Sequence, residues 1–93
     1  MAEGQINGRS LAVIAKDVAE GLISINAYTL KRFDPGHYKT FYFHLQKVLK
    51  ELRGQSFPSN DTLAIRKRNM QLQRLHQART VVEYAAKEQR IAL

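Results

Sequence analysis

Apolar residues recur at spacings of three and four along most of this chain, which is the period of an amphipathic helix. Runs that alternate with a period of two are short, so strands are not expected. Pro35 and Pro58 lie among turn-forming residues and divide the pattern into three segments. The pattern predicts an all-α protein. We expect a compact three-helix bundle, or a four-helix bundle if the first segment breaks, with a long C-terminal helix.

The first segment predicts a helix over residues 9–26. A break or kink near Asn26 is favoured, and a short extension to residue 32 is the alternative, because the apolar stripe continues through Phe33. Ser10 suits the N-cap, since its hydroxyl can accept a hydrogen bond from the first turn. The apolar positions that share the helical period are Leu11, Ile14, Ala15, Val18, Leu22 and Ile25.

The second segment predicts a helix over residues 35–53. Asp34 is the expected N-cap, Pro35 has the fixed φ that suits the first helical position, and Gly54 is expected at C′. The apolar stripe of this helix consists of Tyr38, Phe41, Tyr42, Leu45, Val48, Leu49 and Leu52.

The third segment predicts a helix over residues 60–89, because no glycine or proline follows Asp61. Ser59 or Asn60 is the expected cap, and Phe57 is expected to fold back on the core. One apolar face consists of Ile65, Leu72, Leu75, Val82 and Ala86. An adjacent face consists of Leu63, Met70, Ala78, Val81 and Ala85. A helix with two such faces packs on helices one and two within a monomer, or on one neighbour and a second chain.

Length and composition place the chain among globular proteins. With 93 residues, 44% hydrophobic and 25% charged, residues 1–93 are expected to form one domain. The absence of cysteine excludes disulfides, thiolate metal sites and cysteine nucleophiles. No stretch of about 20 apolar residues and no signal-peptide pattern occurs, so we expect a cytoplasmic protein without membrane contact.

Charge indicates the kind of partner. The net charge is +7 and the pI is about 10.1, and the excess of lysine and arginine lies after residue 30. Such a distribution is typical of a surface that binds nucleic acid. Arg66, Lys67 and Arg74 fall within about 100° of arc on the third helix. The predicted nucleic-acid-binding residues are Lys39, Phe43, Lys47, Lys50, Arg53, Arg66, Lys67, Arg74 and Arg79.

Phe43 is included because of its position in the run Phe41-Tyr42-Phe43. Helical neighbours point about 100° apart, so three consecutive rings cannot all face one core. With the first two rings in the apolar stripe, Phe43 is left among Lys39, Lys47 and Lys50. An aromatic ring among cations can stack on a base. The alternatives are packing against another element, a contact with a partner protein, and incidental exposure.

No pattern in the sequence indicates catalysis or a metal site. His37, His44 and Glu51 are spaced by seven residues, which places neighbours about 10 Å apart on a helix, too far to share a metal ion. No serine or threonine lies in a glycine-flanked elbow, and no acid–base pair is implied by spacing. We therefore expect no enzymatic activity and no cofactor.

The sequence thus favours a small, basic, non-enzymatic nucleic-acid-binding protein, an accessory subunit of a larger nucleoprotein complex. It would contact phosphates through helices two and three with little sequence preference. A helical adaptor for an acidic protein, with Phe43 as a hot spot, is one alternative. A sequence-specific transcription regulator is another, because glutamine and asparagine can read bases. We also expect a protein partner or a homo-oligomer through helix three and Phe43.

In size and charge alone, the chain is comparable to the small helical subunits of CRISPR effector complexes and to small phage or plasmid DNA-binding proteins. No motif in the sequence identifies a family.

Overall fold

The computed structural model describes residues 5–6, 9–31, 33–56 and 60–93. In these residues the helices are α1 (Leu11–Ala19), α2 (Ala27–Leu30), α3 (Pro35–Arg53) and α4 (Thr62–Glu88). Two short strands, β1 (Gln5–Ile6) and β2 (Arg9–Ser10), pair antiparallel ahead of α1. The prediction of an all-α bundle with a long C-terminal helix is confirmed, in its four-helix form.

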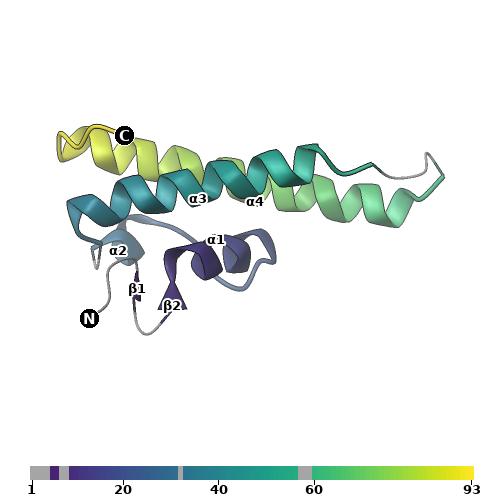
Figure 1. Cartoon of the computed structure of the whole chain (residues 1–93), viewed down its shortest axis with the longest axis horizontal. Helices are drawn as coiled ribbons and strands as arrows, with labels where there is room; N and C mark the ends of the chain where they lie inside the picture. Colours follow the sequence, from purple (N-terminus) through teal and green to yellow (C-terminus); the bar gives the residue numbers. More distant parts are fainter. Residues whose placement is uncertain (1–4, 7–8, 32, 57–59) are drawn as a thin grey trace.

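The longest helices, α3 and α4, run antiparallel beside each other along the long axis of the molecule (Figure 1). Helix α1 packs on both of them, and the whole measures 44 × 26 × 20 Å. The α3–α4 pair extends well beyond the end of α1 (Figure 1). The end of α3 and the first half of α4 therefore lack the third layer that α1 provides elsewhere.

Helix α1 ends at Ala19, earlier than predicted, because Gly21 stops it. Gly21 has φ 80°, and its N–H donates to the Val18 carbonyl at 3.0 Å. The Leu22 N–H donates to the Asp17 carbonyl at 2.9 Å, which completes a Schellman motif. The prediction that helix one continues to residue 26 was wrong, since residues 23–26 belong to no helix.

The predicted restart near Asn26 is confirmed by a reciprocal cap. The Thr29 N–H donates to Asn26 Oδ1 at 3.0 Å, and the Asn26 N–H donates to Thr29 Oγ1 at 2.9 Å. Both polar side chains thus satisfy backbone groups at the start of α2. The single turn that follows buries Leu30 in the core.

The bounds of α3 and its N-cap, Asp34, agree with the prediction, whereas the role of Gly54 differs. The Asp34 N–H donates to His37 Nδ1 at 3.1 Å, ahead of Pro35 in the first turn. Gly54 is the C-cap with φ −80°, rather than a left-handed C′ residue.

At the start of α4, Asp61 takes the capping role that was predicted for Ser59 or Asn60. Its Oδ1 accepts from the Ala64 N–H at 3.1 Å. The prediction for Asn60 was therefore wrong, and Ser59 and Phe57 lie outside the described residues.

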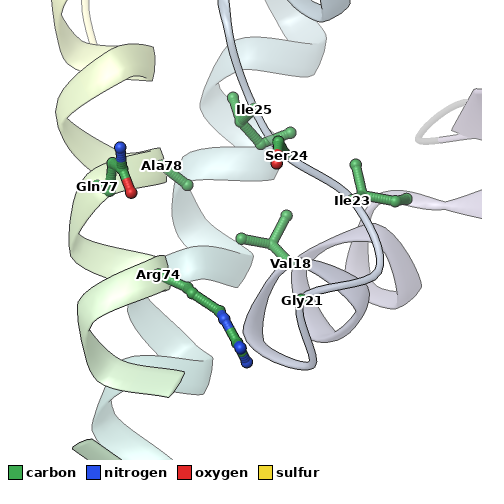
Figure 2. A pocket seen from close by; sticks show the side chains of 8 residues that line it. All are labelled: Val18, Gly21, Ile23, Ser24, Ile25, Arg74, Gln77 and Ala78. Carbon is green, nitrogen blue, oxygen red and sulfur yellow. The ribbon is translucent and has the colours of Figure 1, made fainter. Parts of the chain in front are cut away.

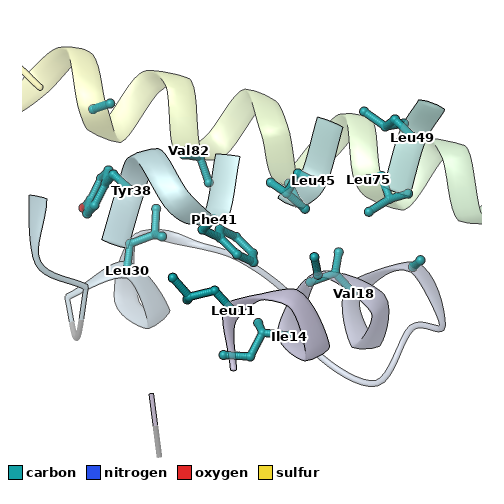
Figure 3. Packing of buried hydrophobic residues seen from close by; sticks show 14 of the residues in the cluster. Leu11, Ile14, Val18, Leu30, Tyr38, Phe41, Leu45, Leu49, Leu75 and Val82 are labelled. Carbon is teal, nitrogen blue, oxygen red and sulfur yellow. The ribbon is translucent and has the colours of Figure 1, made fainter. Parts of the chain in front are cut away.

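The core lies where α1, α2 and the second half of α4 meet α3 (Figure 3). Phe33 packs edge-on against Phe41, with ring centroids 5.3 Å apart. Gln89 Nε2 donates to the Tyr38 hydroxyl at 3.0 Å and fixes the end of α4 to the start of α3. The buried side chains are Leu11, Ile14, Ala15, Val18, Ala19, Leu30, Tyr38, Phe41, Leu45, Leu49, Leu52, Leu75, Ala78, Val82 and Ala86.

Both predicted faces of α4 contact neighbours in the monomer, and their apolar packing on the core begins at Leu72. Leu75 is the first buried residue of this helix, whereas Leu63 and Met70 are exposed. Helices α1 and α3 therefore cover the second half of α4 and leave its first half open.

Candidate nucleic-acid interface

The outward face of α3 carries an exposed ring among lysines. Phe43 is 61% exposed and lies about 160° around the helix from the centre of the buried stripe. Lys39, Lys47 and Lys50, which are four and seven residues from this ring, are exposed as well. No other element in the described part of the chain covers Phe43, so packing within the monomer does not account for it.

The charges on this face have one sign. Lys39 and Lys50 are separated by about 16 Å along the helix axis. The only acidic residue of α3, Glu51, lies about 80° around the helix from Phe43. The Phe43 ring meets the neighbouring His44 ring at an edge, with centroids 5.4 Å apart, which leaves most of its surface to solvent. The face therefore combines a row of cations with an accessible aromatic surface.

Arg53, at the end of α3, is linked to α4. Its Nη2 lies 2.9 Å from His76 Nε2, with the arginine as donor and the unprotonated imidazole nitrogen as acceptor. Burial lowers the pKa of His76, and the nearby charges of Arg79 and Arg53 lower it further. This contact uses one N–H of the Arg53 guanidinium, and its remaining N–H groups can meet a phosphate.

Arg66 and Lys67 are exposed on the first half of α4. Within the described residues neither side chain has a hydrogen bond or an ion pair. An open groove of about 340 Å³ runs along this part of the helix. It is lined by Thr62, Ile65, Arg66, Asn69, Met70 and Gln73.

The Arg74 side chain is bound within the fold and is not a free surface cation. Its Nη1 donates to the Ala19 carbonyl at 3.0 Å, and its guanidinium lies against Gly21 (Figure 2). A cation at this place also opposes the partial negative charge at the end of α1. The sequence period places Arg74 near Arg66 and Lys67 but cannot show that α1 engages it.

Arg79 is also engaged within the fold. Its Nε lies 3.6 Å from Glu83 Oε1, and its side chain is 31% exposed. We therefore leave Arg74 and Arg79 out of the candidate interface. The remaining predicted residues form two groups, one on α3 from Lys39 to Arg53 and one at Arg66 and Lys67.

A cavity of about 190 Å³ lies between the end of α1, the chain that follows it and α4 (Figure 2). The helical period does not predict this cavity, although Gly21, which turns the chain there, is a signal in the sequence. Arg74 is the one ionisable side chain among its lining residues, so the cavity holds no acid–base pair. The lining residues are Val18, Gly21, Ile23, Ser24, Ile25, Arg74, Gln77 and Ala78.

Other kinds of site receive no support from the described residues. Among them no group of three or more histidine, aspartate or glutamate side chains is arranged to hold a metal ion. None of the described helices combines the length and the apolar character that crossing a bilayer requires.

Comparison with protein-family models, with curated proteins and with solved structures gives no match.

Proposed function

We propose that this chain is a small, non-enzymatic nucleic-acid-binding protein that acts in the cytoplasm as an accessory subunit of a nucleoprotein complex. The observation that carries the proposal is the exposed Phe43 ring among Lys39, Lys47 and Lys50. Lysines on one helix face attract a phosphate backbone of any sequence. An exposed ring among them stacks on unpaired bases, which favours a single strand over a duplex.

Low sequence preference follows from the same chemistry. A lysine ammonium is a flexible point charge that meets a phosphate from many directions, and every base has a face on which a ring can stack. Arg53 adds a guanidinium at the end of the row, held toward α4 by His76. We expect three or four of these cations to contact phosphates at once.

The arrangement of α3 and α4 gives little support to a sequence-specific regulator. The two helices run antiparallel beside each other (Figure 1). The helices of a helix-turn-helix cross at about 90–120° and are joined by a short turn. Here the connection spans residues 54–61, and α4 has 27 residues.

A second candidate function is an adaptor for an acidic protein, with the same face as its contact. An exposed phenylalanine is also a common anchor at protein interfaces, and surrounding lysines would pair with carboxylates. Nucleic acid differs from such a partner in one measurable respect, because its bases stack on the ring.

The test uses the absence of tryptophan from the chain. A Phe43→Trp variant carries one fluorescent indole at the proposed contact. We expect a mixed-sequence single-stranded oligonucleotide to quench this indole as bases stack on it. With three or four phosphates bound, affinity should fall about 20- to 50-fold between 50 and 200 mM salt.

The matched control is Tyr84→Trp. Tyr84 is 65% exposed on α4, beside Glu83 and Glu88, and a hydrogen bond with Glu88 raises its pKa. An indole at this acidic place should keep its emission when the oligonucleotide is added. Unchanged emission from Phe43→Trp, or equal quenching of both variants, would contradict the proposal.

A further inference from the structure

Two aliphatic side chains are exposed on the first half of α4. Leu63 is 76% exposed and Met70 is 47% exposed. They are seven residues apart, so they lie almost in line along the helix with about 10 Å between them. Helix α1 ends before it reaches this part of α4 (Figure 1). These side chains therefore have no third layer to pack against.

Arg66 and Lys67 lie on opposite sides of the line from Leu63 to Met70. They follow Leu63 by three and four residues, which places all four side chains on neighbouring positions of the helix surface. Both cations are exposed and have no acidic partner in the described part of the chain. The groove of about 340 Å³ begins beside them, with Arg66 and Met70 in its lining.

We infer that this Leu63–Met70 face binds an acidic amphipathic segment of a partner protein. Its apolar side chains would cover Leu63 and Met70, and its carboxylates would meet Arg66 and Lys67. Charge complementarity supports this occupant, because the chain carries no acidic residue between Asp61 and Glu83.

Other occupants fit this face less well. Two copies of the chain would bring the Arg66 and Lys67 groups of both together without an intervening acid, and like charges repel across an interface. A nucleic acid would satisfy the cations, but aliphatic Leu63 and Met70 offer no ring on which a base could stack.

The Leu63–Met70 face is far from Phe43. Arg53 meets His76 across the helix pair, Phe43 lies ten residues before Arg53, and Leu63 lies thirteen residues before His76. Since α3 and α4 run antiparallel, Phe43 lies about 35 Å from Leu63 and about 24 Å from Met70 along the long axis. A protein segment and a nucleic acid could bind at the same time.

The test begins with selection from a random peptide library of about 16 residues, long enough for four helical turns. The bait is the full chain. We expect selected peptides to be rich in aspartate or glutamate together with leucine, isoleucine or aromatic residues. The best one is then synthesised, and its Kd is measured by calorimetry against variants of the chain.

The double variant Leu63→Ala/Met70→Ala should raise the Kd of this peptide at least tenfold. The double variant Arg66→Glu/Lys67→Glu should have the same effect. Val13→Ala, an exposed aliphatic on α1, is the matched control and should leave the Kd unchanged. Phe43→Ala should also leave it unchanged, so this result is independent of the nucleic-acid proposal. Circular dichroism verifies that each variant keeps its helical content.

Four outcomes would overturn the inference. The selection could yield no binder, or its peptides could lack acidic residues, or the Kd could be insensitive to Leu63 and Met70. The fourth is a dimer of the chain in sedimentation that Met70→Glu abolishes, since a second copy would then occupy the face.

Discussion

Arg74 Nη1 donates a hydrogen bond of 3.0 Å to the carbonyl oxygen of Ala19, which lies 55 residues earlier in the chain. This bond joins the end of α1 to the middle of α4. A carbonyl in the last turn of a helix has no N–H partner within the helix, and here the charged Arg74 guanidinium supplies the donor. It also removes the guanidinium from the set of cations that a polyanion could reach.

Replacement of Arg74 should therefore affect stability more than binding. A hydrogen bond from a charged group contributes about 1.5–3 kcal/mol, so we expect Arg74→Ala to lower the free energy of unfolding by about 2 kcal/mol. Arg66→Ala, an exposed cation on the same helix, should change it by less than about 0.5 kcal/mol. Urea denaturation followed by circular dichroism measures both. Equal effects of the two substitutions would contradict the structural role of Arg74.

Replacement of Arg90 by glycine should stabilise the fold. It follows the C-cap of α4 with φ 59°, a left-handed conformation that costs an ordinary residue about 1 kcal/mol. The Ile91 N–H donates to the Ala86 carbonyl at 2.8 Å, so the Schellman motif depends on this conformation. We expect Arg90→Gly to raise the free energy of unfolding by roughly 0.5–1 kcal/mol. Arg90→Ala is the control, and an equal gain from it would point to charge rather than to backbone conformation.

The lysines of α3 should determine the salt dependence of nucleic-acid binding. Each phosphate contact with a single strand contributes about 0.7 to the slope of log K against log salt. In a variant with glutamine at Lys39, Lys47 and Lys50, the magnitude of this slope should therefore be smaller by about 2. The matched variant replaces three exposed lysines elsewhere, Lys16, Lys31 and Lys87. Fluorescence anisotropy with a labelled oligonucleotide separates the two, and the same loss in both would indicate only a diffuse charge effect.

Phe43 and Phe41 should respond in opposite ways to truncation. Phe43→Ala removes an exposed ring, so stability should change by less than about 1 kcal/mol while oligonucleotide binding weakens by about 1–3 kcal/mol. Phe41→Ala opens a cavity in the core and should cost about 3–5 kcal/mol of stability. Thermal melts and anisotropy titrations on the two variants make the comparison. A large loss of stability from Phe43→Ala would show that its ring is covered in solution.

Acidification should weaken the fold through His76. Its pKa in the folded state is below the ordinary value of 6.5 because of burial and of the charges of Arg79 and Arg53. The unfolded chain therefore binds the proton first as the pH falls, and stability is lost as the pH drops through and below about 6.5. Protonation would also remove the acceptor that holds Arg53.

The variant His76→Gln serves as the comparison for this pH effect. It has no group that titrates at this position, so its melting temperature should fall less between pH 7.5 and pH 5.5 than that of the unchanged chain. Parallel pH profiles of the two proteins would exclude the role of His76.

The sequence predicted those features that depend on neighbouring residues. Pro35 and Gly54 mark the limits of α3, and the helical period separates the buried Phe41 from the exposed Phe43. The end of α1 was missed although Gly21 signalled it, because Leu22 and Ile25 happen to continue the apolar period after the helix has stopped. The left-handed conformation of Gly21 ends the helix there, although the apolar period of the sequence continues.

The sequence could not predict which cations bind within the fold and which remain exposed. Arg66 and Arg74 have the same residue type, and the helical period places them on neighbouring parts of α4. Their difference arises because the end of α1 contacts Arg74, whereas the first turns of α4 extend beyond α1 (Figure 1). Such contacts between distant segments depend on the relative lengths and positions of whole helices, which a local pattern does not contain.

Because α4 is covered unevenly, hydrogen exchange in its first half can be compared with exchange in its second half. All of its buried residues lie from Leu75 onward, and its first turns extend beyond the end of α1 (Figure 1). Backbone amides near Leu63 and Met70 should therefore exchange faster than those near Val82. A ligand on the first half would slow the fast amides and leave the slow ones unchanged. A single peptide map of α4 would then distinguish local docking from a general gain in stability.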